Sequence, residues 1–237
     1  MTLVKLELQR ITRRRGSFYG AMGVAVAIAV LTVLLAAGDG SENVWGQVFG
    51  IPMVFGATIV GALAGSYDTS QGTMRYLVLT GQPRRKLVLL RLPAIIAAIT
   101  LFAVPAALIA TAAMAADGQS AEVIGRVLAG TMLGSYAWGA VSMAIGTMLR
   151  SNGAGIGVAL TLFLAGSILT QVVREEVSQR AGDYLLPNVV FVVSSLAHAT
   201  GEMEPFTVGL AAAGAALLAW LTAILGFAVA RAERDEY

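Results

Sequence analysis

Six long apolar segments that carry no charged side chain constrain this chain more than any other feature. They cover residues 17–37, 48–66, 92–116, 127–149, 154–173 and 207–230, and none contains Asp, Glu, Lys, Arg or His. A helix needs about 20 apolar residues to cross the roughly 30 Å hydrocarbon core of a bilayer, and only helices and closed barrels satisfy the backbone there. We therefore expect an all-α integral membrane protein with six transmembrane helices.

Composition excludes the other broad classes. Apolar residues make up 57% of the 237 residues and charged residues only 13%, about half the charged share of a typical soluble domain. Such a chain is neither soluble nor intrinsically disordered. It contains no cysteine, which excludes disulfide-stapled modules, thiolate metal sites and cysteine nucleophiles.

The basic residues predict the orientation of the chain. The net charge of +2 is too small to indicate nucleic-acid binding. All but three of the 16 basic residues lie in the termini, in the loop 67–91 or at Arg150; the exceptions are Arg126, Arg174 and Arg180. Basic residues stay on the cytoplasmic side. We expect a multi-pass protein in the cytoplasmic membrane of a prokaryote, with both termini cytoplasmic.

The segments outside the six spans complete a single transmembrane domain over residues 1–237. The basic N-terminal stretch resembles the start of a signal peptide, but the apolar run 17–37 exceeds the roughly 7–15 residues of a signal core, which predicts a retained anchor. The outer loop 174–206 contains the apolar stretch 185–199, interrupted near its start by Pro187 and Asn188. That stretch is too short to span and predicts a re-entrant segment before the sixth span.

Residues 1–16 have the pattern of an amphipathic helix on the membrane surface. Val4, Leu8 and Ile11 recur at helical spacing, which predicts one apolar face. The basic side chains available for lipid phosphates are Lys5, Arg10, Arg13 and Arg14. The alternative is that these charges serve only as a topology signal.

The chain lacks an energy source of its own. Transport driven by protons or sodium usually needs a titratable or coordinating side chain at membrane depth, and the six spans have none. No Gly-x-x-x-x-Gly-Lys-Ser/Thr phosphate loop occurs either. We expect no enzymatic activity from this chain, and any uphill transport needs work from another polypeptide.

The loop 67–91 is the longest cytoplasmic segment. Residues 73–79 are predicted to form a short helix, which ends before Gly81 and Pro83. The loop carries Asp68, then Gly72-Thr73, and then Pro83 with Arg85. This order resembles the membrane subunits of type 2 ABC exporters, and so does the outline of basic entry helix, six spans and re-entrant segment. That family usually has glutamate at the position of Asp68 and lysine at that of Arg91.

The resemblance implies how the chain works. It implies a coupling helix that sits in a cleft of a separate ATPase, with Asp68, Gln71, Gly72, Thr73, Arg75 and Tyr76 as its coupling residues. It implies an assembly of two membrane subunits, identical or paralogous, with two ABC ATPase subunits. ATP and magnesium belong to those partners, and this chain binds no cofactor. The alternative is that Asp68, Arg75 and the basic group Arg84–Lys86 only solvate a cytoplasmic turn and fix topology, which suits Arg84–Lys86 equally well. For Asp68 and Gly72-Thr73 we favour coupling, with Asp68 as a cap of the next helix or as the partner of a basic residue.

Few polar groups lie within the spans. Tyr136, Trp138, Ser142 and Gln171 line a substrate path or serve as interfacial anchors and packing, and the sequence does not separate these alternatives. The expected cargo is hydrophobic or amphipathic, because no charge in the spans compensates a buried ion. On the outer side, a solvated loop accounts for the charged residues Arg174, Glu175, Glu176, Arg180, Asp183, His198, Glu202 and Glu204. We expect no metal site.

Three glycine pairs have the spacing of close helix contacts. They are Gly61 with Gly65, Gly130 with Gly134, and Gly153 with Gly157. Such pairs let helix backbones approach each other. We expect them to pack helices within one subunit rather than to form a dimer contact.

Two other functions compete with an exporter. A scaffold or sensor subunit without transport would share the fold and lose the ATPase contact. An intramembrane serine hydrolase needs a serine and a histidine on facing spans, but the single histidine, His198, lies outside the six segments and no Gly-x-Ser-Gly sequence occurs. We therefore favour the permease subunit of an ATP-driven ABC exporter.

Overall fold

The computed structural model describes residues 3–13, 15–36, 42–71, 81, 83–195 and 208–234, and within these ranges all regular structure is helical. The helices are α1 Leu3–Thr12, α2 Arg15–Ala36, α3 Glu42–Ser70, α5 Arg84–Leu89, α6 Arg91–Ala116, α7 Ala121–Leu149, α8 Asn152–Glu176, α9 Gln179–Asp183, α10 Leu186–Ser195 and α11 Leu210–Arg234. The expectation of an all-α chain is confirmed for this part of the protein.

Five helical stretches are long and apolar enough to cross a membrane. They are Gly50–Ser70, Arg84–Ala116, Ala121–Leu149, Asn152–Glu176 and Ala211–Arg234. They coincide with the second to sixth predicted spans and are consistent with a multi-pass membrane protein. The first predicted span, 17–37, coincides with α2, which is not one of the five.

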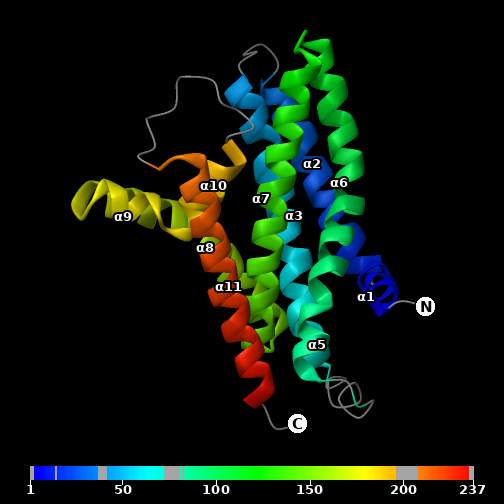
Figure 1. The fold of residues 1–237 in the computed structure, drawn as a ribbon. Coiled ribbons are helices and arrows are strands. Elements are labelled where there is room, and N and C mark those ends of the chain that lie inside the picture. The colour runs from blue at the N-terminus through cyan, green and yellow to red at the C-terminus, as the bar shows by residue number, and fades with distance from the viewer. Residues whose placement is uncertain are drawn as a thin grey trace.

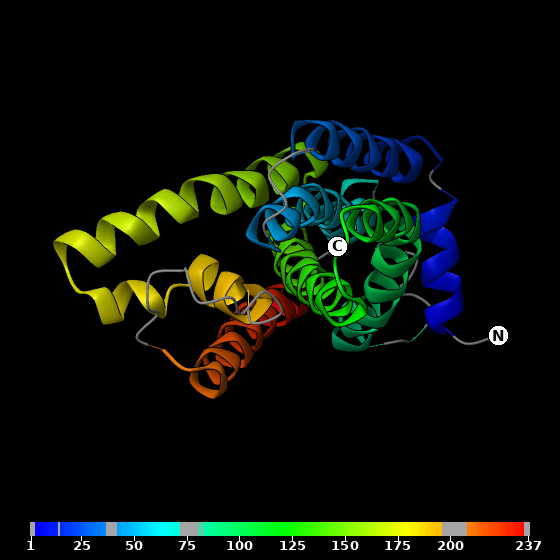
Figure 2. The same cartoon turned by 90° about the horizontal axis from the view of Figure 1, so that it is seen from above.

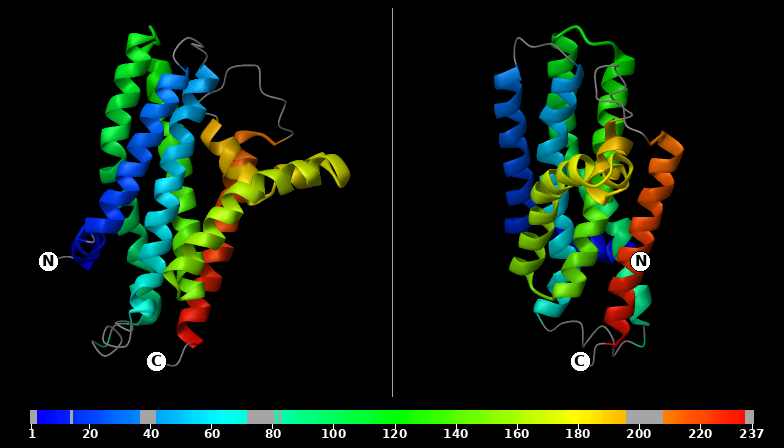
Figure 3. Two further views of the ribbon diagram at one scale, coloured as in Figure 1. Left: turned by 180° about the vertical axis from the view of Figure 1, so that it is seen from behind. Right: turned by 90° about the vertical axis from the view of Figure 1, so that its left-hand side faces the viewer.

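The long helices form a bundle with α3 and α7 at its centre. Figure 1 shows α2, α3, α6 and α7 side by side, with α11 on the other flank. Viewed from above in Figure 2, α8 leads away from the bundle, and α9 and α10 return toward it. Figure 3 shows that α1, α5 and the C-terminal end of α11 all lie toward the same end of the bundle. That end also receives most of the basic residues of the described part of the chain.

The centre of the bundle is held by close contact between α3 and α7. A Cβ atom added at Gly61 or Gly65 would collide with backbone atoms of Gly139 or Met143, and one at Gly146 would collide with Ala62. The packing predicted for Gly61 and Gly65 is confirmed, and the partner is α7 of the same chain. A Cβ at Gly153 or Gly157 would meet no atom within 4 Å, so the third glycine pair makes no such contact in the chain.

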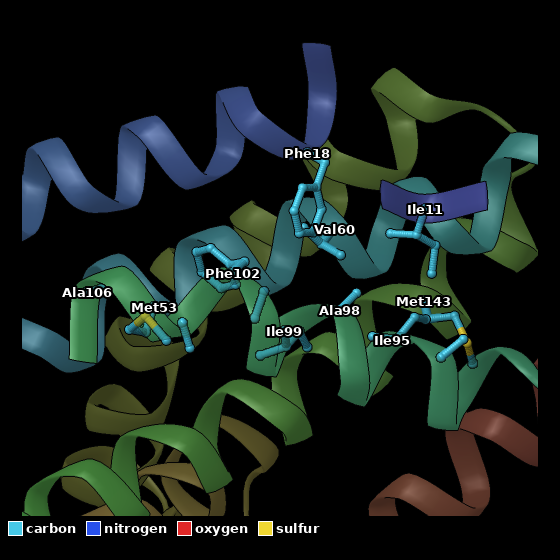
Figure 4. Close-up of a cluster of buried hydrophobic side chains, with 13 residues drawn as sticks. Ile11, Phe18, Met53, Val60, Ile95, Ala98, Ile99, Phe102, Ala106 and Met143 are labelled. Carbon is cyan, nitrogen blue, oxygen red and sulfur yellow. The ribbon is translucent and has the colours of Figure 1, made fainter. Parts of the chain in front are cut away.

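An apolar core joins the two N-terminal helices to this centre. Figure 4 shows Ile11 of α1 and Phe18 of α2 over the side chains of α3 and α6, with Met143 of α7 at its edge. Phe102, Ile95 and Ile99 of α6 are fully buried here. Val4 and Leu8 pack against the same cluster. The three residues predicted to share an apolar face thus pack against the bundle, and in Figure 2 α1 lies across the bundle rather than along it.

The helices extend beyond the predicted spans. The second span was expected to end at residue 66, but α3 continues to Ser70. The fourth was expected to begin at 127, but α7 begins at Ala121, where Ser120 accepts a hydrogen bond from the amide of Val123. The predicted loop 67–91 is also partly helical, because α5 leads almost directly into α6. Apolar windows mark the part of a helix that suits the bilayer, whereas helices continue into polar turns.

The apolar stretch 185–199, which was predicted to be re-entrant, contains the short helix α10. The ten residues of α10 are too few to cross a bilayer core of about 30 Å. Val189, Val190, Val192 and Val193 of α10 are buried in a cluster with side chains of α7 and α11. The rest of the predicted segment, 196–199, lies outside the described residues, as do His198, Glu202 and Glu204.

Candidate functional site

A buried carboxylate, Asp68, lies in the last turn of α3, at the end of the bundle that carries α1 and α5. The side chain is only 3% exposed. Sequence reasoning placed Asp68 in a loop, whereas the structure places it within α3. The helix 73–79 that it was considered to cap lies outside the described residues. A buried carboxylate is costly unless cations and hydrogen bonds compensate it. The neighbours of Asp68 must therefore supply positive charge.

Arg91, the first residue of α6, is the more buried partner. Its side chain is 1% exposed, and Nη2 donates to Asp68 Oδ2 over 2.5 Å. Nη1 donates to the backbone carbonyl of Gly65 over 3.0 Å. Arginine supplies both bonds because its planar guanidinium presents several donors in a fixed fork. Arg91 thereby joins the start of α6 to the last two turns of α3.

Arg10 of the surface helix α1 is the second partner. Its Nη2 donates to Asp68 Oδ1, and its Nη1 donates to Glu7 Oε1 over 2.8 Å. Burial lowers the pKa of Arg10, but the charges of Asp68 and Glu7 and the hydrogen bonds to both outweigh it and raise the pKa above its ordinary value. The guanidinium therefore stays charged.

Close packing brings the backbone of Gly65 to this cluster. The residue has no side chain, so α3 approaches α7 until a Cβ at Gly65 would overlap Met143. The next residue, Ser66, donates from Oγ to Oδ1 of Asn152 at the start of α8 over 2.7 Å. Ser70 Oγ donates to the same Asn152 oxygen over 3.2 Å. The end of α3 is thus attached to α1, α6, α7 and α8.

The cluster joins helices rather than forming an open binding site. Asp68 and Glu7 are matched by Arg10 and Arg91, so the four side chains carry no net charge at neutral pH. Both oxygens of Asp68 are engaged by guanidinium groups. The cluster thereby links α1 to the end of α3 and the start of α6.

The structure describes only some of the residues predicted to act together. Asp68 is buried in the cluster, whereas Gln71 is exposed directly after α3, Lys5 is exposed on α1, and Arg13 is exposed directly after α1. Gly72, Thr73, Arg75 and Tyr76, the predicted helix 73–79 and Arg14 lie outside the described residues. Sequence reasoning did not identify Glu7, predicted Gly65 only as a helix-packing residue, and noted Arg91 only as a departure from a family pattern. The sequence allowed the prediction that Asp68 pairs with a basic residue, but it did not show which basic residue.

The four polar residues considered for a substrate path are not brought together. Tyr136 shares a hydrogen bond of 2.8 Å with Thr100 of α6, whereas Trp138 packs edge-on against Phe163 of α8. The Ser142 hydroxyl donates to the carbonyl of Trp138 within α7. Gln171 is exposed on α8 and donates to Glu175. The first three therefore have contacts within the bundle, and Gln171 has its contact on the exposed side of α8.

A second buried charge lies at the far end of α8. Asp183 is fully buried, with Oδ1 3.2 Å from Nε of Arg174 and 3.3 Å from the amide nitrogen of Asn188. Gly182 leaves the space that Arg174 occupies. The expectation that a solvated loop accounts for Asp183 and Arg174 is therefore wrong, because these groups hold α9 and α10 against α8. Among the described residues, no group of three metal-ligating side chains occurs.

Comparison with known proteins identifies one family. The family model described as "Protein of unknown function (DUF2705)" matches residues 17–232. The chain belongs to this family. The match covers α2 to α11 and with them Asp68 and Arg91, whereas α1 and Arg10 precede it. No curated protein matches the chain.

Proposed function

We propose that this chain is the permease subunit of an ATP-driven ABC exporter that moves a hydrophobic or amphipathic substrate out of the cytoplasm. In this proposal it crosses the cytoplasmic membrane six times, with α2 as the first span and both termini in the cytoplasm. A second permease subunit and two ATPase subunits complete the complex. The observation that carries the proposal is the buried cluster at Asp68.

The position of the cluster suits a role in coupling a partner's ATP hydrolysis to movement of the membrane helices. It lies where α3 ends and the segment 72–80 begins, which is the segment that the resemblance to type 2 ABC exporters assigns to the ATPase contact. A push on that segment is transmitted through Asp68 to Arg91 of α6 and Arg10 of α1. The buried ions and close glycine contacts support a rigid response, because packed interiors transmit strain. The six predicted apolar spans contain no Asp, Glu, Lys, Arg or His, which is consistent with a permease whose energy comes from a partner.

Purification tests the assembly. The tagged full-length chain, extracted from native membranes in a mild detergent, should retain an ATPase with a Walker-type phosphate loop in stoichiometric amount. Mass spectrometry identifies the partner, and a phosphate-release assay measures turnover. Recovery of the chain without any ATPase would contradict the exporter and favour a scaffold or sensor subunit.

A matched pair of variants tests the cluster. Arg10→Gln removes the bond between α1 and Asp68, whereas Arg13→Gln changes an exposed residue directly after the same helix. We expect Arg10→Gln to lower ATP turnover of the assembled complex severalfold and Arg13→Gln to leave it unchanged. Both variants should retain the ATPase. Equal turnover in the two variants would remove the coupling role of the cluster.

A further inference from the structure

A pocket lies between α5 and the last turn of α11, at the basic end of the bundle. It is lined by Pro83, Arg85, Lys86, Leu89, Leu90 and Glu233 and has a volume of about 430 Å³. Pockets that hold small ligands usually have volumes of roughly 300–1,000 Å³. Figure 1 shows α5 beside the end of α11. The pocket does not include any residue of the Asp68 cluster.

Hydrogen bonds from Arg84 and two buried apolar side chains hold the two walls of this pocket in place. Arg84 Nη1 donates to the carbonyl oxygens of Ala232, over 3.4 Å, and Glu233, over 3.2 Å. The C-terminal carbonyls of a helix have no partner within the helix and attract cations. Leu87 and Val88 are buried on the side of α5 that faces the protein. The basic residues of the pocket are therefore not needed to fix its shape.

The pocket has an excess of positive charge. Arg85 and Lys86 are both exposed, and Glu233 supplies one negative charge. Within the described part of the chain, neither Arg85 nor Lys86 is in an ion pair. Two cations against one carboxylate favour an anionic ligand. Arginine and lysine are the usual partners of phosphate groups.

The apolar part of the lining indicates where that anion comes from. Leu89 is 38% exposed, and with Leu90 it lies where α5 leads into the membrane-spanning part of α6. The pocket therefore has cations on its polar side and leucines on the side of the apolar span. A free phosphate ion has no apolar part that would contact the leucines. A phospholipid carries its phosphate next to acyl chains, which do. Basic pockets at the cytoplasmic ends of membrane helices bind such headgroups.

We propose that this pocket binds the headgroup of an anionic phospholipid. The phosphate lies between Arg85 and Lys86, and the upper acyl region lies against Leu89 and Leu90. Glu233 repels the headgroup and limits the affinity. Because α5 and α11 both contribute, bound lipid bridges the end of α11 to the start of α6. The proposal needs only a membrane-embedded chain and is independent of the ATPase.

Native mass spectrometry of the delipidated full-length protein in detergent tests the proposal, with phosphatidylglycerol and phosphatidylcholine as probes. We expect one phosphatidylglycerol to bind in preference to phosphatidylcholine. Each basic side chain near an anionic lipid surface is worth about fivefold in affinity. The double variant Arg85→Gln with Lys86→Gln should therefore bind phosphatidylglycerol about 25-fold more weakly. Glu233→Gln should bind it about fivefold more tightly.

The controls separate this site from other anion binding. Arg180→Gln removes an exposed basic residue of α9 that does not line the pocket, and it should leave the affinity unchanged. Equal loss in Arg180→Gln, or equal binding of the two lipids, would overturn the proposal. Displacement of the lipid by millimolar inorganic phosphate would assign the pocket to a soluble anion instead. Loss of the ATPase from the double variant, with lipid binding intact, would assign it to a protein partner.

Discussion

At the scale of single residues, the most consequential pair is Asp68 with Arg91, because both side chains are almost completely buried. Replacing a whole buried ion pair by apolar groups is often neutral, whereas removing one partner is strongly destabilising. The remaining charge then has no compensation in a medium that solvates it poorly. The two residues should therefore behave as one unit in a double-mutant cycle.

Arg91→Met should lower the free energy of unfolding by about 3 kcal/mol, the lower end of the usual range for a broken buried pair, because Arg10 still contacts Asp68. Adding Asp68→Asn should cost less than the sum of the two single variants by at least about 1 kcal/mol. Unfolding of the purified protein by SDS titration in mixed micelles measures these differences. Arg180→Met, at an exposed position, is the control and should change stability by less than about 0.5 kcal/mol. Additive single costs would show that the pair is not coupled.

Sequence reasoning recognised Asp68 as important but not its surroundings. The partner Arg91 lies 23 positions away along the chain, and Arg10 lies 58 positions away. No local pattern encodes such distances, because the pairing depends on how α1, α3 and α6 meet. Arg174 and Asp183 were interpreted as solvated for the same reason. Their burial follows from the return of α9 and α10 toward the bundle, which hydropathy does not reveal.

At the scale of helices, the contact between α3 and α7 depends on missing side chains. Gly65→Ala places a methyl group where backbone atoms of Met143 and Thr147 lie. Neither helix can yield locally, so the two must separate. We expect a loss of about 1–3 kcal/mol, as for other overpacked interiors. SDS titration again measures it.

The matched control for this variant is Gly157→Ala. Gly157 lies in a long apolar helix, but an added Cβ there meets no atom within 4 Å. It should therefore leave stability unchanged or raise it slightly, because alanine favours a helix. A comparable loss in both variants would mean that the cost arises from helix backbone effects and not from the α3 contact.

Helix existence was predictable, whereas helix ends were not. Five of the expected spans coincide with long helices because an apolar run of this length has few other stable conformations. The ends differ because Glu122 and Arg126 are compatible with a helix but not with an apolar window, so α7 begins earlier than expected. The packing of Gly61 and Gly65 was predictable from spacing. Spacing alone does not show that Gly153 and Gly157 lack a contact.

At the scale of the whole molecule, the arrangement predicts a sidedness that chemistry can test. Lys5 is exposed on α1, Lys86 on α5 and Arg180 on α9, and Figure 1 shows α9 to the side of the bundle, away from α1 and α5. The chain contains no cysteine, so single cysteine variants at these positions need no other change. In right-side-out cells, a membrane-impermeant maleimide should label Arg180→Cys. It should label Lys5→Cys and Lys86→Cys only after permeabilisation. Labelling of Lys5→Cys in intact cells would reverse the proposed orientation.

The short connection between α7 and α8 has a consequence for how the protein is made. Only Arg150 and Ser151 separate these helices, Arg150 adopts a left-handed backbone conformation (φ 55°), and Asn152 is already bonded to the end of α3. During biosynthesis the two helices should enter the bilayer together as one hairpin, after α3 is in place. An insertion at this turn, such as a reporter or an epitope, should prevent α7 and α8 from inserting together. The incompletely inserted chain would then be degraded by quality-control proteases.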